Sequence, residues 1–355
     1  MILYRCSVQR QLKQIKRCMF KVGLTRDFLT PEGILTYKDM GLDILDDIKE
    51  IEYEFLEKWE SPLQAGTLQQ YDAIISLAPA YTAESFIGVT RLKAICRFGV
   101  GYDMVDVNAC SRANVVVTIT KGAVNYSVAE AIITWMLALC HKLVAKDKLV
   151  RQGKWQERNH YTGSELRSRT PGIIGFGGIG SRLTHMLKAF HMNQPLVYDP
   201  YIDEAKASEL GVRKVDMQTL LQSSDFISIN CPLTPETKNM IDEKELMQVK
   251  ESAFIINTAR GGIINERALI EALLNNKIAG YATDVFENEP VTSDHPFFTM
   301  DNVLLAPHCI AWTHELFREI GRMACTQVAQ IAQGKTPDHV LNTDILDKWY
   351  SEKIK

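Results

Sequence analysis

Three glycines at fixed spacing form the first pattern in the chain that carries chemistry. Gly175, Gly177 and Gly180 follow an apolar run and come directly before a helix-like segment. In that context GxGxxG predicts a dinucleotide site. The first glycine permits a tight turn, the second lets a pyrophosphate approach the backbone, and the third lets the helix pack against the strand. The start of that helix would offer unpaired N–H groups to the phosphates.

An acidic residue at a suitable distance indicates which nucleotide binds. Asp199 lies 19 positions after Gly180 (199 − 180), at the end of the next apolar run. A carboxylate there accepts hydrogen bonds from ribose hydroxyls and repels a 2′-phosphate, which favours NAD over NADP. A glycine turn with an incidental acid is the alternative, and strand, helix and acid together favour the NAD site. The turn residues expected at the cofactor are Gly175, Gly177, Gly178, Ile179 and Gly180.

The elements that position these residues come in two series of short apolar runs that alternate with helix-like segments. A chain of 355 residues exceeds the usual single-domain size. Alternation of this kind predicts parallel sheets covered by helices, and hence an α/β fold with two domains. We expect strands at 22–25, 53–56, 73–77, 94–99, 115–120, 172–177, 195–200, 226–232, 253–259, 280–285 and 302–307. We expect helices at 31–45, 83–92, 180–189, 243–249, 266–274 and 313–333.

A longer helix is predicted to begin near Ser127, between the two series. Ser127 and Glu130 have the spacing of a capping box, in which each side chain satisfies a backbone N–H at the helix start. The polar stretch 151–169 that follows predicts a surface excursion. Its Trp155 packs either on a partner subunit or on its own domain, and the sequence favours neither.

Composition excludes several function classes. The formal net charge is −3, which argues against a dedicated nucleic-acid binder. No apolar run reaches the roughly 20 residues that span a bilayer. The eight cysteines are scattered, so we expect no metal site and a reducing compartment, the cytoplasm. Residues 1–18 carry five basic and no acidic side chains, and we interpret them as an extension rather than a transit peptide.

From about Lys21 to Asn342 the chain resembles the D-isomer-specific 2-hydroxyacid dehydrogenase family, which includes phosphoglycerate dehydrogenase and glyoxylate reductase. The segments that carry the resemblance are FGVGYDMVD (98–106), NYSVAEA (125–131), GIIGFGGIG (172–180), CPLTPET (231–237), NTARGGIINE (257–266), DVFENEP (284–290) and APH (306–308). The resemblance implies two Rossmann-like domains, a flavodoxin-like substrate domain with an inserted NAD-binding doubly wound domain, and a homodimer. The implied divisions are an extension (1–18), the substrate domain (19–122 and 312–355) and the NAD-binding domain (123–311).

The resemblance also implies roles for individual residues. Arg260 would bind the substrate carboxylate and carbonyl oxygen, His308 would act as acid and base, and Glu289 would tune the imidazole. Their side-chain chemistry suits those roles, because a guanidinium binds carboxylates bidentately and an imidazole titrates near neutral pH. The family contacts substrate through a loop that here holds Val100 and Gly101. Its nicotinamide contacts fall on Cys231, Pro232, Thr258, Ala259 and Asp284.

The function so implied is hydride transfer between NAD and a small D-2-hydroxy acid. The loop at 78–81 reads APAY, without the Arg-Ser pair common in phosphoglycerate dehydrogenases, although Arg97 remains a candidate for a phosphate. Phe98 stands where a smaller residue is frequent and suggests a reshaped pocket, and Trp312 either lines the site or belongs to the core. Two alternatives stay open: an NAD-sensing protein resembling the C-terminal-binding corepressors, and an enzyme oxidising another small anion such as phosphite.

Overall fold

The computed structural model describes residues 19–354 and divides them into two compact units. The first unit comprises residues 19–121 and 317–354, and the second comprises 122–316. The sequence suggested divisions after residues 122 and 311, close to these. The proposed extension, 1–18, lies outside the described residues.

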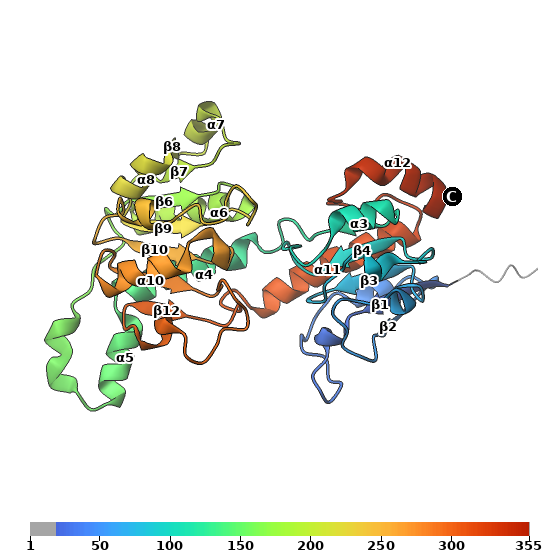
Figure 1. The fold of residues 1–355 in the computed structure, drawn as a ribbon, viewed down its shortest axis with the longest axis horizontal. Coiled ribbons are helices and arrows are strands. Elements are labelled where there is room, and N and C mark those ends of the chain that lie inside the picture. The colour runs from blue at the N-terminus through green and yellow to red at the C-terminus, as the bar shows by residue number, and fades with distance from the viewer. Residues whose placement is uncertain (1–18, 355) are drawn as a thin grey trace, which may run out of the picture. The chain divides into compact units, whose positions relative to one another are not determined.

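The first unit is built on a five-stranded parallel sheet (Figure 1). The strand order β2-β1-β3-β4-β5 is that of flavodoxin-like folds. α11 (His314–Ala332) is tied to β5, because Thr118 donates to Gln327, which in turn donates to the carbonyl of Ile119. The strands are β1 (Phe20–Leu24), β2 (Ile51–Phe55), β3 (Ala73–Ser76), β4 (Ala94–Arg97) and β5 (Val116–Thr118). The helices are α1 (Asp43–Asp46), α2 (Ala65–Leu68), α3 (Val107–Arg112) and α12 (Leu346–Trp349).

The second unit holds a seven-stranded parallel sheet in the order β12-β11-β10-β9-β6-β7-β8 (Figure 1). The order reverses at β6, as in doubly wound dinucleotide-binding folds. The predicted α/β class with two Rossmann-like domains is therefore confirmed. The strands are β6 (Pro171–Ile174), β7 (Leu196–Tyr198), β8 (Arg213–Lys214), β9 (Phe226–Ile229), β10 (Phe254–Asn257), β11 (Gly280–Thr283) and β12 (Val303–Leu305). The helices are α4 (Asn125–Cys140), α5 (Leu143–Arg151), α6 (Gly178–Leu187), α7 (Glu204–Glu209), α8 (Met217–Ser223), α9 (Glu243–Leu246) and α10 (Glu266–Leu274).

Strand alternation explains how this second sheet is covered on both faces. Ile227 and Ile229 of β9 pack in one apolar cluster with Leu269 of α10. Phe226 points to the opposite face and shares a cluster with Ile132 of α4. Because successive strand residues face opposite sides, a strand buried on both faces is apolar at most positions, which is why these runs were visible in the sequence.

Two predicted helices are wrong. Of the segment 31–45 only α1 is helical, and of 83–92 only a short turn, η2 (Glu84–Phe86). Gly33 and Gly41 have φ values of +83° and +72°, and Gly88 has a φ of +74°. Each glycine adopts a left-handed conformation that cannot continue a right-handed helix, so helix-like spacing of apolar residues was overridden by the backbone.

The predicted capping box is also wrong. α4 begins at Asn125 with Val124 at its N-cap, and no side chain caps it. Ser127 therefore lies inside the first turn, where it cannot act as the cap. The stretch 151–169 contains a 3₁₀ segment, η3 (Trp155–Tyr161). Within residues 19–354 no single helix is long and apolar enough to cross a membrane, and α4 with α5 would meet that test only as a pair bent by 57°.

Candidate active site

The glycine turn after β6 has the geometry that a dinucleotide requires. Gly175 has a φ of +87°, and a Cβ there would lie 2.7 Å from the amide nitrogen of Cys231. A Cβ on Gly180 would lie 2.6 Å from the carbonyl oxygen of Gly175. A Cβ on Gly177 would meet nothing within 4 Å. The outer glycines are thus required by packing, whereas Gly177 faces open space at the start of α6. Gly178 and Ile179 follow it in the first turn, and a Cβ on Gly178 would overlap Nδ2 of Asn125.

Asp199 anchors this turn from the end of β7. Its Oδ2 accepts a hydrogen bond from the amide of Phe176 (2.6 Å) and its Oδ1 accepts one from Tyr201 (2.7 Å). A carboxylate has about four acceptor sites, so both oxygens can still accept from ribose hydroxyls. The geometry therefore suits the NAD-selecting role inferred from the sequence.

Further predicted cofactor contacts lie at the ends of adjacent strands. Cys231 and Pro232 follow β9, Thr258 and Ala259 follow β10, and Asp284 follows β11. These strands are neighbours in the sheet, so their carboxyl ends share one edge. Burial raises the pKa of the Cys231 thiol to about 11, which keeps it neutral and unreactive near neutral pH.

Asp284 provides a specific test of fit to the cofactor. Its Oδ2 accepts from the amide of Ile310 (3.2 Å), whereas its Oδ1 is buried without a hydrogen-bond partner among the described residues. Burial raises the pKa of Asp284, although the hydrogen bond from Ile310 and the charge of His308 oppose that effect. A buried acceptor requires a donor. The carboxamide of a nicotinamide ring is such a donor, so the residues present fit NAD.

His308 and Glu289 form a hydrogen-bonded couple. His308 Nδ1 lies 2.8 Å from Glu289 Oε2, and the amide of Phe286 donates to Glu289 Oε1 over 3.0 Å. The side chains of His308 and Glu289 are 50% and 37% exposed. An ionised carboxylate only accepts, so Nδ1 carries the proton and Nε2 is left to face a ligand. Both Glu289 oxygens are engaged, which fixes the carboxylate.

This couple shifts both pKa values toward the charged forms. The hydrogen bond to Glu289 is the main cause that raises the pKa of His308, while burial and the charge of Arg260 oppose it. Burial acts to raise the pKa of Glu289, but the hydrogen bonds from His308 and Phe286 outweigh it, and the pKa is lowered. The imidazole is therefore protonated more readily than a free histidine.

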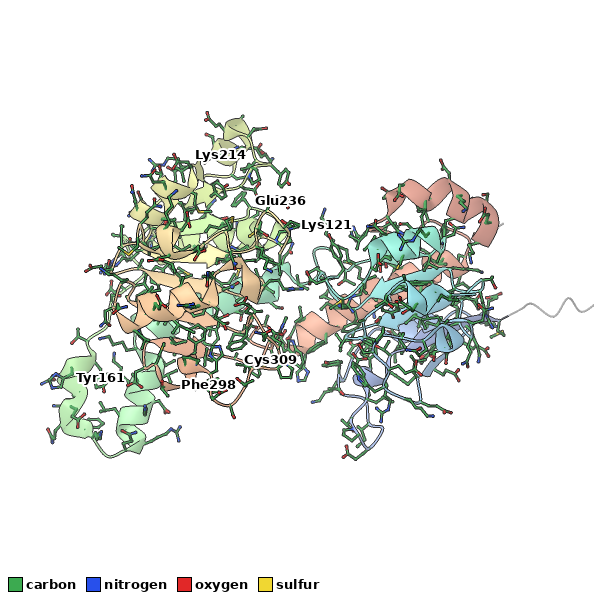
Figure 2. All side chains as sticks on the ribbon, in the orientation of Figure 1. Lys121, Tyr161, Lys214, Glu236, Phe298 and Cys309 are labelled. Atoms are coloured by element: carbon green, nitrogen blue, oxygen red, sulfur yellow. The ribbon has the colours of Figure 1, made fainter. Side chains whose placement is uncertain are left out.

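The backbone of His308 adopts an uncommon conformation. Its φ is +53°, in the left-handed region that costs energy for a residue with a Cβ. The amide of His308 donates to the carbonyl of Asp284 (2.9 Å), which holds the residue at the end of β12. Figure 2 labels Cys309, the next residue along this loop.

Arg260 is placed by a turn at the end of β10. Asn257 closes this turn, because its Nδ2 donates to the carbonyl of Arg260 (2.8 Å) and its Oδ1 accepts from Ala259 (3.0 Å). The charge of Arg260 acts on the pKa of both Glu289 and His308. Arg260, Glu289 and His308 follow three adjacent strands, β10, β11 and β12, of one unit.

Sequence reasoning missed the residues that support this group. Asn257 and Phe286 stood within the segments 257–266 and 284–290 that carry the family resemblance, but neither was given a role. Gly261 is required by a close approach, because a Cβ there would overlap the carbonyl group of Phe286. An asparagine and a glycine flanking an arginine after a strand were the available signals.

The other predicted substrate contacts belong to the first unit. Val100 and Gly101 follow β4. The buried side chain of Arg97 donates to the carbonyls of Gly101 (3.1 Å), Ser76 (2.7 Å) and Leu77. Its guanidinium is therefore engaged with backbone, which disfavours the phosphate-binding role.

Two further aromatic residues differ in burial. Phe98 packs against Phe28, with ring centroids 4.9 Å apart, and is buried. It belongs to the core of the first unit, and its expected effect on the shape of a pocket stays a prediction. Trp312 is exposed, so its core alternative is wrong.

The chain is similar to a set of known oxidoreductases. The family model described as "D-isomer specific 2-hydroxyacid dehydrogenase, NAD binding domain" matches residues 133–309. Glyoxylate reductase from Thermococcus litoralis is 35% identical over 92% of this chain and 98% of its own length. D-3-phosphoglycerate dehydrogenase from Archaeoglobus fulgidus is 34% identical over 85% of this chain, which spans only 59% of that relative. The NAD-dependent formate dehydrogenase from Staphylococcus aureus in complex with NAD has a TM-score of 0.74 and 30% identity, covering 87% of this chain and 95% of its own.

Proposed function

The chain belongs to the D-isomer-specific 2-hydroxyacid dehydrogenase family, and we propose from that premise that it interconverts a small D-2-hydroxy acid and its 2-keto acid with NAD. The observation that carries the proposal is the hydrogen bond between His308 and Glu289 beside Arg260, at the strand ends that also hold the cofactor residues. A proton donor, a carboxylate that orients it and a fixed cation are what 2-keto acid reduction requires.

His308 is proposed to move the proton. When bound, NADH supplies the hydride that reduces C2, and the oxygen of the carbonyl then needs one proton. Because Nδ1 is held by Glu289, Nε2 of the imidazolium gives that proton, and His308 becomes neutral. In the oxidation direction the neutral Nε2 removes the hydroxyl proton. Glu289 holds the ring orientation in both directions and favours the protonated state.

Arg260 is proposed to bind the substrate carboxylate and to polarise the C2 carbonyl. A guanidinium presents parallel N–H donors that match the two oxygens of a carboxylate. In this structure Nη1 of Arg260 donates to the carbonyl of Ala259 over 2.7 Å, and a substrate would bind through the other donors. Val100 and Gly101 are proposed to bind the carboxylate through backbone N–H groups. Since Arg97 is engaged with the carbonyls of Ser76 and Gly101, a substrate with a single acidic group is favoured over a phosphorylated one.

The test is a screen of NADH oxidation with glyoxylate, hydroxypyruvate, phosphohydroxypyruvate and longer 2-keto acids. Turnover of one of the unphosphorylated acids is expected. The variant His308→Gln should lose about 10²–10⁴-fold in kcat, the usual contribution of a positioned acid–base group, while NADH binding is retained. Retained kcat in that variant would remove His308 from the mechanism.

The same screen separates the two alternatives. No turnover above background on any keto acid, with NADH still bound, would favour the corepressor-like binding role. Turnover of phosphite with NAD and none of the keto acids would favour the other anion. Formate is disfavoured, because formate enzymes typically carry Gln where Glu289 stands.

A homodimer is proposed from the exposed apolar side chains of α5 and η3. Leu143, Val144, Val150 and Trp155 are all exposed, with Trp155 at 60%. In Figure 1 this pair of elements extends beyond the sheet of its own unit. Apolar side chains gathered on one projecting segment are typical of a protein interface. Packing of Trp155 on its own domain, the other alternative, is not supported by that exposure.

Cytoplasmic location is proposed from cysteine chemistry. The six cysteines among the described residues are free thiols, four of them buried. Oxidising compartments favour disulfides, so free thiols are typical of a reducing one. Fractionation of cells that express the full chain would check this, and recovery in a membrane-bound organelle would contradict it.

A further inference from the structure

A second histidine–glutamate couple lies in the unit that holds His308, and the proton chemistry proposed above does not use it. His295 Nε2 lies 3.0 Å from Glu266 Oε1. The two side chains are 12% and 17% exposed, so this couple is more buried than His308 and Glu289. His295 precedes η6 (Pro296–Thr299), and Glu266 is the first residue of α10.

The hydrogen bonds define which nitrogen of His295 carries a proton. The amide of Phe297 donates to His295 Nδ1 over 3.3 Å, so Nδ1 is an acceptor and Nε2–H donates to Glu266. The other oxygen of Glu266, Oε2, accepts from the amide of Glu287 over 3.2 Å. Glu266 therefore joins His295 to the backbone of the loop that carries Glu289.

These hydrogen bonds continue from Glu266 to His308, the proposed acid. The residue before Glu287 is Phe286, whose amide donates to Glu289 Oε1, and Glu289 Oε2 bonds His308 Nδ1. The ring of Phe286 also meets the ring of His295 edge to face, with centroids 5.7 Å apart. The rings of Phe297 and Phe298 also lie near the ring of His295, with centroids 4.8 and 5.9 Å away; Figure 2 labels Phe298.

The 286–289 loop also packs closely against the turn that carries Arg260. A Cβ on Gly261 would overlap the carbonyl of Phe286 and approach the amide of Glu287. The backbones of the two loops are thus in direct contact. A displacement of residues 286–287 would therefore disturb both the hydrogen bond to the carboxylate of Glu289 and the backbone contact with Gly261, the neighbour of Arg260.

We propose that Glu266 and His295 are positioning residues for the reaction, which hold the 286–289 loop so that Glu289 stays bonded to His308. The inference rests on the proposed function, to which it adds two residues that do not touch substrate. It differs from a purely structural ion pair in its consequence. A structural pair affects only the stability of the fold, whereas a positioning pair also affects how readily His308 takes a proton.

The experiment compares His295→Asn with His295→Gln in the full chain. The shorter asparagine can still accept from Phe297 but does not reach Glu266, whereas the glutamine amide reaches Glu266 as a donor. The control is Glu271→Gln, on the same helix α10, which removes an exposed pair with Arg267. Exposed pairs of that kind contribute little.

The primary readout does not depend on turnover. It is the NMR titration of the His308 ring, assigned with His308→Gln. In His295→Asn, His308 should titrate at lower pH than in the wild type, as it should in Glu289→Gln. In His295→Gln and Glu271→Gln the titration should stay at the wild-type pH. Where a substrate has been found, kcat in His295→Asn should fall about 10–100-fold, the cost of misplacing a catalytic group by about 1 Å.

A double variant tests the route of the effect. Since His295 is proposed to act through Glu289, the double variant Glu289→Gln/His295→Asn should match Glu289→Gln alone in its His308 titration. An additive effect in the double variant, or an unshifted His308 titration in His295→Asn, would refute the positioning role. His295 and Glu266 would then contribute only to the stability of the fold. If His295→Asn does not fold, Glu266→Gln replaces it. That change leaves one acceptor for two donors and should shift the titration in the same direction. Failure of the keto-acid screen would refute the proposed function. The titration would still decide whether His295 and Glu266 control the protonation of His308, because it does not depend on turnover.

Discussion

Replacing Glu289 by glutamine should weaken the reaction moderately and change its pH dependence. The substitution keeps the size of the side chain but removes the charge that holds His308 Nδ1 at 2.8 Å. A hydrogen bond between charged groups contributes about 1.5–3 kcal/mol. Because the two side chains are 50% and 37% exposed, water screens part of it, and about 1–2 kcal/mol remains. At 1.36 kcal/mol per tenfold, kcat for reduction should fall roughly 5–30-fold.

The sign of the pH effect follows from the direction of the His308 pKa. Glu289 raises it, with a further contribution from Asp284, while burial and Arg260 lower it. Reduction needs the protonated ring, so its rate is full at low pH and is lost as pH rises through that pKa. Without the carboxylate this loss should begin at lower pH. Oxidation needs the neutral ring, so in the variant it should persist to lower pH than in the wild type.

The assay is kcat and kcat/KM in both directions across the pH range, with Glu287→Gln as the control. Glu287 is exposed on the same loop, and its backbone rather than its carboxylate is bonded to Glu266, so the same charge is lost without touching His308. A Glu289→Gln enzyme whose pH limbs coincide with those of the wild type would refute the reasoning. Equal shifts in Glu287→Gln would attribute the effect to net charge.

The other predictions concern the cofactor turn and the projecting segment. Gly180→Ala should lower the free energy of unfolding by about 1–3 kcal/mol, because its Cβ would lie 2.6 Å from a carbonyl oxygen. Gly177→Ala should keep the wild-type Tm and weaken NAD binding, because its Cβ would meet no protein atom. Equal Tm values for the two variants would contradict this. Asp199→Ala should raise KM for NAD about 10–100-fold and reduce the ratio of kcat/KM for NAD to kcat/KM for NADP, both measured by steady-state kinetics. An unchanged ratio would exclude Asp199 from ribose binding. Trp155→Ala should shift the sedimentation coefficient toward that of a monomer without lowering the Tm of the monomer. The control Leu274→Ala, on α10 and similarly exposed, should leave the sedimentation coefficient unchanged. A wild-type chain that sediments as a monomer would refute the dimer.

Most strands could be predicted because burial on both faces forces apolar runs such as those of β9 and β10. β8 was missed because it holds only two residues, Arg213 and Lys214, and both are polar. They pair with Leu196 and Val197 of β7 at the edge of the sheet. Helix predictions failed where a glycine with positive φ interrupts apolar spacing, as at Gly41 and Gly88. Hydrophobic periodicity reports which residues are buried but not the sign of φ. It therefore predicted the buried strands and failed for the helices that a left-handed glycine interrupts.

The candidate site was predictable only in part. The glycine turn and Asp199 follow from spacing, because their geometry is local to one strand–helix–strand unit. His308 and Glu289 are 19 positions apart, and His295 and Glu266 are 29 apart, so their contacts are created by the order of strands in the sheet. Resemblance to a family pointed to the first couple and not to the second. Contacts of this kind depend on topology, which residue types alone do not specify.

The placement of Arg260, Glu289 and His308 on neighbouring strand ends of a single unit has an evolutionary consequence. The proposed proton transfer depends on hydrogen bonds that lie within residues 122–316, whereas the proposed substrate contacts Val100 and Gly101 belong to the other unit. We therefore expect mutations outside that span to change which acid is accepted while leaving the bond between His308 and Glu289 intact. On this proposal, new substrates can evolve without rebuilding the acid–base couple.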